Sequence, residues 1–244
     1  MLDRVRRNRE RLDVDLRDSW RRKYFSPAIL SLYSRLIPRL RAVASGTLLD
    51  VGSGTMPFRS QVGDLVEKYH SLDIERRVPD VDFVADITQM EPVGSGTYDL
   101  VLCSQVLEHI AQPDKAIREV MRVLRPGGRL VLTVPFLSRL HEEPFDYFRF
   151  TEYGLRVLLE NAGFRVTEVV PAGSLISFVG HQVSTIVVCG VWGVPVLKEV
   201  AFWLNAVLVA LPCYWLDRLL RIEKKIPLNY VVVALKPEEA SLPG

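Results

Sequence analysis

Cysteine is scarce in this sequence, and its placement excludes proteins stabilised by structural zinc or by a disulfide scaffold. The 244 residues contain 3 cysteines, which lie far apart in apolar surroundings at Cys103, Cys189 and Cys213. The sequence has no C-x-x-C pair, whereas structural zinc sites and disulfide scaffolds depend on paired or closely spaced cysteines. We therefore expect a reduced intracellular protein without a structural metal.

A large excess of charge of one sign is also lacking, because the formal net charge is only +2. The charge is nevertheless uneven: residues 1–41 hold 12 Lys and Arg against 5 Asp and Glu, so the rest holds 19 against 24. Such a basic arm favours an anionic neighbour, membrane or nucleic acid, although a solvated helix with i,i+4 pairs has the same composition. The first residues, MLDRVRRNRERLDVD, are too charged for a secretory signal, so we expect a cytoplasmic location.

Charged residues are absent from two long stretches near the C-terminus. Val169–Leu197 is a run of 29 residues without Lys, Arg, Asp or Glu, and Val200–Leu216 adds 17 more. A helix that spans a membrane needs about 20 apolar residues, but glycines and polar residues interrupt the first run and the second is short. The pattern predicts an apolar helical hairpin. Residues 174–222 would then contact a membrane surface, a second subunit or a hydrophobic acceptor.

Short apolar runs alternate with helical spacing through the middle of the chain. The runs end at Val51, Ile74, Ala85, Ser104, Pro135 and Val170, and a seventh covers 229–235. This alternation predicts an α/β fold with a doubly wound, seven-stranded, mostly parallel, Rossmann-like sheet. The expected parts are a basic helical arm (1–46, with breaks near Pro27 and at Pro38), a cofactor-binding core (47–173), the apolar insertion (174–227), and the last strand with its tail (228–244).

A glycine turn follows the first expected strand, in the segment LLDVGSGT. A strand that ends in glycines leaves backbone N–H groups open to a ligand. The dinucleotide motif G-x-G-x-x-G has a third glycine, but here the three positions are Gly52, Gly54 and Pro57. Such a turn serves either a dinucleotide or an S-adenosyl ligand, and the missing third glycine argues against the dinucleotide.

Carboxylates stand at the ends of the first three strands. Asp50 precedes the turn, Asp73 ends the second strand, and Asp86 follows the third. Asp73 is placed to accept hydrogen bonds from both ribose hydroxyls of an adenosine, and Asp86 from its adenine amino group. Each acid would also serve to cap a helix, but the three share the carboxyl edge, where open α/β sheets bind their ligands.

These segments together resemble the class I S-adenosylmethionine-dependent methyltransferases, in particular the bacterial small-molecule branch typified by ubiquinone-biosynthesis enzymes. The matching segments are LLDVGSGT, SLDI, VADIT, YDLVLCSQVLEHI and REVMRVLRPGGRLVLTVP, and they cover roughly residues 47–170. The later segment HEEPFDYFRFTEYGLRVLLENAGF resembles a subgroup associated with bacterial cell-surface glycan and lipid pathways.

The resemblance implies that the chain binds S-adenosyl-L-methionine. It implies that the Gly52–Gly54 turn lies under the methionine part, with Asp50 near the amino group. Asp73 would then hold the ribose and Asp86 the adenine. The other implied cofactor residues are Ser53 in the turn, Ile74 and Ile87 beside the adenine ring, Ser104 and Gln105 beside the sulfonium, and His109 one turn further on.

The residues that activate the acceptor are expected in the loop after the fifth strand. A methyl sulfonium is a good electrophile, so the main task is alignment, but a hydroxyl acceptor also needs a base. We expect His141 to be that base, with Glu142 and Asp146 as further candidates. The alternative is that His141 and Asp146 only hydrogen-bond the loop to itself.

The expected activity is methyl transfer, most favourably to oxygen, on a small or lipid-linked acceptor. The alternatives are a non-catalytic S-adenosyl-binding or membrane-associated protein and, less favoured, a nicotinamide-dependent oxidoreductase. Nucleic acid is not an expected partner, because Ser104–Leu107 replaces the Asn/Asp-Pro-Pro-aromatic motif of base-amino methylation. A homodimer and peripheral attachment to the inner face of the cell membrane are both compatible with the apolar run.

Overall fold

The computed structural model describes residues 2–16 and 19–238 and divides the chain into two compact units. The sheet unit comprises Ile37–Val170 and Tyr230–Gly244, and the helical unit comprises Met1–Leu36 and Pro171–Asn229. The candidate cofactor residues and the candidate base all belong to the sheet unit.

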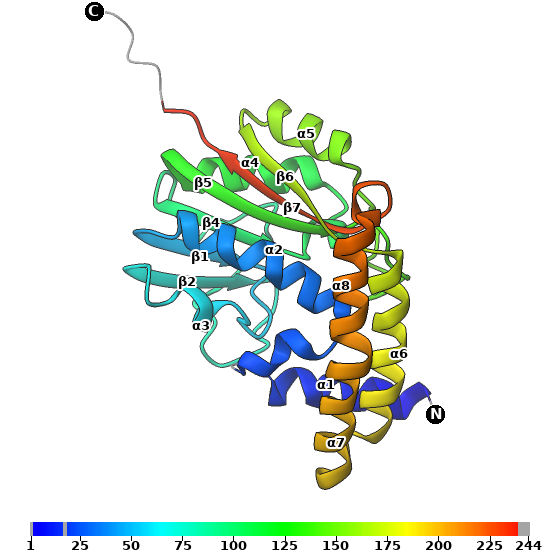
Figure 1. Ribbon diagram of the computed structural model, residues 1–244. Helices are drawn as coiled ribbons and strands as arrows, with labels where there is room; N and C mark the ends of the chain where they lie inside the picture. The colour runs from blue at the N-terminus through cyan, green and yellow to red at the C-terminus, as the bar shows by residue number, and fades with distance from the viewer. Residues whose placement is uncertain (1, 17–18, 239–244) are drawn as a thin grey trace, which may run out of the picture. The chain divides into compact units, whose positions relative to one another are not determined.

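The chain forms a 7-stranded sheet in the order β3-β2-β1-β4-β5-β7-β6 (Figure 1). The strands are β1 (Thr47–Val51), β2 (Lys68–Asp73), β3 (Phe83–Val84), β4 (Tyr98–Ser104), β5 (Leu124–Pro135), β6 (Arg165–Ser174) and β7 (Pro227–Leu235). The pairs β1–β2, β1–β4, β2–β3 and β4–β5 are parallel. The predicted α/β fold, with a doubly wound and mostly parallel sheet, is confirmed.

The strand register brings the predicted site to one edge of the sheet. Val51 pairs with Leu72 on one side and with Cys103 on the other, and Asp73 pairs with Val84. The loops that follow β1, β2, β3 and β4 therefore leave the sheet at neighbouring points. This is the carboxyl edge, where ligands bind in open α/β sheets.

Helices of the sheet unit cover an apolar core. In α4 (Pro113–Val123) the buried residues Ala116, Ile117, Val120 and Val123 recur at helical spacing and join the core cluster of the strands. The helix α5 (Glu152–Asn161) begins at Thr151, whose hydroxyl accepts a hydrogen bond from the Gly154 N–H at 3.0 Å.

The short helix α3 (Arg59–Val62) follows the turn after β1. One expectation about the helices was wrong. The expected break at Pro38 does not occur, because Pro38 lies inside α2 (Pro27–Val43). Leu36 and Leu40, on either side of the proline, are fully buried. Burial of two leucines is worth about 3–6 kcal/mol, which offsets a proline cost of about 3 kcal/mol.

The helical unit contains the predicted apolar insertion, which is confirmed as helices between β6 and β7 (Figure 1). Its elements are α1 (Leu2–Asp15), η1 (Trp20–Tyr24), α6 (Leu175–Val191), α7 (Pro195–Asn205), the π-helical turn η3 (Ala206–Ala210), α8 (Leu211–Leu220) and η4 (Ile222–Lys224). Leu12, Phe25, Trp192 and Phe202 belong to its buried core.

A buried carboxylate fixes the beginning of α6 against α8. Asp217 is 1% exposed and accepts hydrogen bonds from the Ser174 N–H at 3.0 Å and from the hydroxyls of Ser174 and Ser177. A charge in apolar surroundings is tolerated only when such donors compensate its lost hydration. This network is therefore a polar tie between the two helices of the insertion.

We predict that Asp217→Ala lowers the free energy of unfolding by about 2–4 kcal/mol, because the N–H and hydroxyl of Ser174 would lose their buried acceptor. Urea denaturation followed by circular dichroism measures the change. The control is Asp114→Ala, which removes an exposed i,i+4 pair with Arg118 and should cost much less, because solvent screens exposed ion pairs. Equal losses in the two variants would contradict the prediction.

Candidate functional site

The two positions in the turn after β1 are glycine for different structural reasons. Both have positive φ angles, +65° at Gly52 and +53° at Gly54. A Cβ at Gly52 would lie 2.3 Å from Cγ2 of Val106, whereas a Cβ at Gly54 would meet nothing within 4 Å. Packing therefore requires Gly52, while Gly54 leaves the backbone open to the approach of a ligand.

Asp73 is hydrogen-bonded to this turn. The Gly54 N–H donates to Asp73 Oδ2 at 2.8 Å, and the Ser53 N–H donates to the Leu72 carbonyl at 3.1 Å. The Asp73 side chain is buried. An ionised carboxylate has about four acceptor positions, so it can accept from ligand hydroxyls while it holds the turn. The structure thus brings together the turn and the acid that are expected to bind the same ligand.

Asp50 lies in β1, beneath the same turn. It is 2% exposed and accepts a hydrogen bond from the Tyr69 hydroxyl. Burial raises the pKa of Asp50 to about 7; the Tyr69 bond opposes this shift, and the charge of Asp73 adds to it. A cationic group of a ligand would favour the ionised form of Asp50.

The three residues expected around an adenine ring differ in accessibility. Asp86 is exposed, and its Oδ1 accepts from the N–H of Thr88 at 2.7 Å and from its hydroxyl at 2.8 Å. Ile74 is 65% exposed, but Ile87 is only 5% exposed and belongs to the core cluster. Ile87 thus packs with the core beside the turn after β3, and its role beside a ring stays a prediction.

The end of β4 is held by a residue that sequence analysis did not single out. Thr133 of β5 is fully buried. Its hydroxyl lies 2.8 Å from Ser104 Oγ and accepts from Gln105 Nε2 at 3.1 Å. Gln105 has a φ of +57°, which costs about 1–3 kcal/mol in a residue other than glycine. Thr133 thus helps to hold Gln105 in the left-handed conformation in which it turns away from the strand.

The loop after β5 is attached to the short helix η2 (Leu107–His109), which follows β4. The N–H groups of Tyr147 and Phe148 donate to the Glu108 carbonyl at 2.9 and 3.2 Å. His109 and His141 have their ring centroids 4.8 Å apart. The backbone therefore places the expected base, His141, next to the expected cofactor residue His109.

Asp146 orients His141. Its carboxylate receives two bonds from Arg149, at 2.6 and 2.8 Å, and one from the His141 N–H at 3.0 Å. The Arg149 bonds hold the pKa of Asp146 well below its usual range. The expected alternative, that His141 and Asp146 hydrogen-bond the loop to itself, is thus present. Glu142, the third candidate, is exposed with a φ of +52°.

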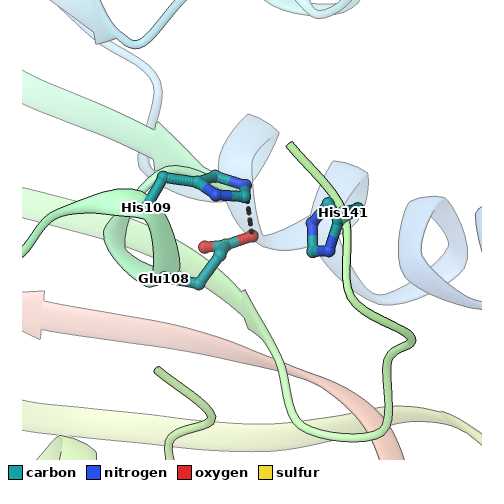
Figure 2. Close-up of side chains that lie close together, drawn as sticks. All are labelled: Glu108, His109 and His141. Carbon is teal, nitrogen blue, oxygen red and sulfur yellow. Dashed lines mark ion pairs between the residues drawn. The ribbon is translucent and has the colours of Figure 1, made fainter. Parts of the chain in front are cut away.

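Glu108 is the chemical group that sequence reasoning missed. Its side chain is fully buried, and within the described part of the chain neither carboxylate oxygen has a hydrogen-bond partner. Oε1 lies 3.8 Å from His109 Nε2 (Figure 2). Burial raises the pKa of Glu108 to about 8. The sequence feature that could have identified Glu108 is the segment VLEHI, in which a glutamate stands next to a histidine just beyond the carboxyl end of a strand.

The turn has the features that an S-adenosyl ligand requires. Gly54 leaves space where a Cβ would stand, and the buried Ser53 hydroxyl has no partner within the described residues. Asp73 and Asp50 add one acceptor for hydroxyls and one for a cationic group. The residues therefore fit an adenosine that carries an amino-acid chain.

Residues 20–169 match a family model described as a methyltransferase domain. The demethylmenaquinone methyltransferase of Renibacterium salmoninarum is 32% identical over 133 residues, which cover 50% of this chain and 54% of the relative. The chain spans about half the length, or less, of the first curated relatives that it matches.

Two solved structures show the same fold at low sequence identity. The [4+2]-cyclase SpnF has a TM-score of 0.58 and 20% identity, with 86% of this chain and 82% of that chain covered. The phosphoethanolamine N-methyltransferase 2 of Haemonchus contortus was solved with phosphomonomethylethanolamine and S-adenosylhomocysteine. It has a TM-score of 0.56 and 17% identity, with 87% of this chain and 54% of that chain covered.

We predict that the two glycines of the turn respond differently to alanine. Gly52→Ala should cost more than about 2 kcal/mol of the free energy of unfolding, because the new methyl group would overlap Val106. Gly54→Ala should cost only about 1 kcal/mol, from its left-handed conformation. Urea denaturation measures both. In the double variant Gly52→Ala/Val106→Ala part of the loss should return, and an undiminished loss would refute the role given to Val106.

Proposed function

The chain belongs to the class I S-adenosylmethionine-dependent methyltransferase family, and we propose that it transfers a methyl group to oxygen of a small or lipid-linked acceptor. The observation that carries this proposal is the bond from the Gly54 N–H to the Asp73 carboxylate, which joins the glycine turn to the acid for the ribose. The similar proteins include C-, O- and N-methyltransferases, and we propose oxygen for this chain.

We assign the binding roles from the contacts of each residue. Asp73 accepts from the ribose hydroxyls, and Asp50 pairs with the ammonium group of the methionine part. The space beside Gly54, where a Cβ would stand, lets the ligand approach the protein backbone closely. The Ser53 hydroxyl, which has no hydrogen-bond partner among the described residues, is available to the ligand. S-adenosylmethionine supplies an activated methyl group on a sulfonium. Alignment of the acceptor with this group is the main contribution of the protein.

The acceptor must lose a proton during transfer to oxygen. The acceptor hydroxyl releases its proton, its oxygen forms a bond to the methyl carbon, and the S–CH₃ bond breaks with its electron pair left on sulfur. The products are a methyl ether, S-adenosylhomocysteine and one proton. We place His141 in the group that activates the acceptor, and Asp146 is a positioning residue, because Arg149 and the His141 backbone engage its carboxylate.

Aromatic side chains of the same loop favour an apolar acceptor. Phe145, Tyr147 and Phe148 are 59%, 46% and 36% exposed. Exposed aromatic rings near a site are typical of pockets that take large apolar ligands. We propose that these rings contact the acceptor.

We further propose that the helical unit contacts a lipid bilayer that carries the acceptor. The stretch Pro195–Leu220 is long and apolar enough to cross a membrane by length and composition, and only 28% of its most apolar window is buried. Many of its large apolar side chains are exposed, namely Val196, Leu197, Val200, Trp203, Leu204, Val207, Leu208, Trp215, Leu216, Leu219 and Leu220. Exposed apolar surface of this extent marks an interaction site.

Charge complementarity favours lipid as the occupant. Arg218 lies in the last turn of this stretch, Arg221, Lys224 and Lys225 follow it, and all four side chains are exposed. Basic residues at the end of an apolar helix bind anionic headgroups. At the other end of the stretch, Glu199 pairs with Arg21 and Lys198 pairs with Asp15. The charges of Glu199 and Lys198 are therefore compensated within the protein. The basic side chains lie together at the opposite end of the stretch, as contact with anionic headgroups requires.

Binding of S-adenosylhomocysteine should depend on Asp73. We predict that Asp73→Ala weakens binding by about tenfold or more in isothermal calorimetry, because hydrogen bonds to a charged acceptor are worth about 1.5–3 kcal/mol. The control is Asp80→Ala, an exposed acid beyond the same strand. Unchanged affinity of the Asp73→Ala variant for S-adenosylhomocysteine would contradict the cofactor assignment.

A labelled-methyl assay on membrane lipids and soluble metabolites, read by mass spectrometry, then separates transfer from mere binding. Normal ligand binding without any labelled product would favour the non-catalytic alternative.

Membrane contact should be sensitive to charge on the apolar surface. We predict that the full chain floats with anionic phospholipid vesicles and that Val207→Asp/Leu208→Asp abolishes flotation, because buried aspartates oppose insertion. The matched control is Val157→Asp on α5, since Val157 and Val207 are each 58% exposed.

Unchanged flotation of the double variant would contradict the proposal. Loss of a dimer without any effect on flotation would assign the surface to a second copy of the chain instead.

A further inference from the structure

We propose that Glu108, His109 and His141 bind a divalent transition-metal cation. Each residue offers one ligand atom, and these atoms all lie within 4.8 Å of one another. Figure 2 shows the Glu108 carboxylate and the two imidazole rings grouped together, from η2 and from the loop after β5. Two histidines and one carboxylate are a recurrent donor set for zinc, iron and cobalt.

The hydrogen bond of His109 leaves the correct ring nitrogen free. Its Nδ1 lies 2.8 Å from the carbonyl oxygen of Phe145. A carbonyl can only accept, so Nδ1 carries the hydrogen, and the lone pair of the neutral ring is on Nε2. Nε2 is the atom that lies 3.8 Å from Glu108 Oε1. The lone pair therefore belongs to the nitrogen beside the carboxylate.

His141 is arranged in the same way. Its Nδ1 lies 3.1 Å from the Arg139 carbonyl and 3.3 Å from Asp146 Oδ2, and both atoms are acceptors. Nδ1 thus carries a hydrogen, and Nε2 is the nitrogen available to a cation. A histidine whose second nitrogen donates to a carboxylate or a carbonyl is the usual surrounding of a metal ligand.

Glu108 supplies an independent observation. The side chain is fully buried, and in the described part of the chain both of its oxygens lack a hydrogen-bond partner. Buried carboxylates are normally paired, hydrogen-bonded or bound to metal. Two cationic groups are close enough to matter: the charge of Arg149 also acts on Glu108, but its guanidinium is hydrogen-bonded to Asp146. His109 would have to be protonated to compensate the charge. A bound cation satisfies Glu108 while both histidines stay neutral.

The position of the group gives the cation a use. η2 directly follows the turn at Gln105, and His141 reaches η2 because the Tyr147 and Phe148 N–H groups bind the Glu108 carbonyl. A cation lowers the pKa of a hydroxyl that it binds, which would assist loss of the acceptor proton to solvent. With Nδ1 protonated and Nε2 on the cation, His141 would then act as a ligand and not as the base expected from the sequence. This use rests on the proposed function, but binding of the cation does not. The sequence-based expectation of no metal rested on cysteine spacing, and no cysteine takes part here.

The test is cobalt binding by the full chain after treatment with a chelator, without S-adenosyl ligand or acceptor. We expect one Co²⁺ per chain, with a visible absorption band, displaced by Zn²⁺. Glu108→Gln, which keeps the size of the side chain, and His141→Ala should each weaken binding by about 10-fold or more, and His109→Ala serves as a further variant. The control is His70→Ala on β2, where His70 lies 3.0 Å from the Tyr98 hydroxyl.

Circular dichroism shows which variants are folded. Absence of Co²⁺ binding in the unmodified chain would overturn the proposal, and so would affinity that stays unchanged in the folded Glu108→Gln and His141→Ala variants. A chain that binds Co²⁺ but not S-adenosylhomocysteine would refute the proposed function and leave the cation site standing. The reverse result would refute the cation site alone.

Discussion

One hydrogen bond, from the Gly54 N–H to Asp73 Oδ2, joins the two halves of the candidate cofactor site. It links the turn after β1 to the end of β2, and parallel pairing of Val51 with Leu72 brings those two points together. The turn can take this shape only because residue 52 has no side chain to overlap Val106. The ligand assignment of Asp73, the role of Gly54 and the place of Asp50 all depend on this local geometry.

Much of the fold was predictable because its signals are local. Buried parallel strands are short apolar runs, and polar residues at their ends mark where the chain leaves the sheet, as at Asp73 and Ser104. The roles of single side chains were less predictable, because they depend on residues far apart in sequence. Thr133 holds Gln105 across two strands, Ile87 is drawn into the core, and Pro38 is accommodated within a buried helix. Glu108 lies in the segment VLEHI, but only the fold shows that its carboxylate is buried without a hydrogen-bond partner among the described residues.

The two units solve the burial of polar groups in different ways. In the helical unit, Asp217 is surrounded by hydroxyl and N–H donors, and Asn8 and Asn205 each donate to a backbone carbonyl. Its buried polar groups therefore stabilise the packing of apolar helices. Among the described residues of this unit, Asn205 Oδ1 and the hydroxyls of Ser184 and Thr185 are buried without a hydrogen-bond partner, but these groups are neutral. In the sheet unit, by contrast, it is the carboxylates of Asp50, Asp73 and Glu108 that keep unused acceptor positions, at one end of the strands. Unused acceptors in a buried position are the property that the proposed ligands require.

The central claim, that Asp73 holds the ribose of an S-adenosyl ligand, is tested most directly by the ratio of two dissociation constants. These are the constants for S-adenosylhomocysteine and for its analogue without the ribose 2′-hydroxyl, measured on the unmodified chain by calorimetry. A site built to bind that hydroxyl leaves a buried charged acceptor unpaired when it is missing, so the analogue should bind about tenfold more weakly or worse. Equal affinity for the two compounds would contradict the account.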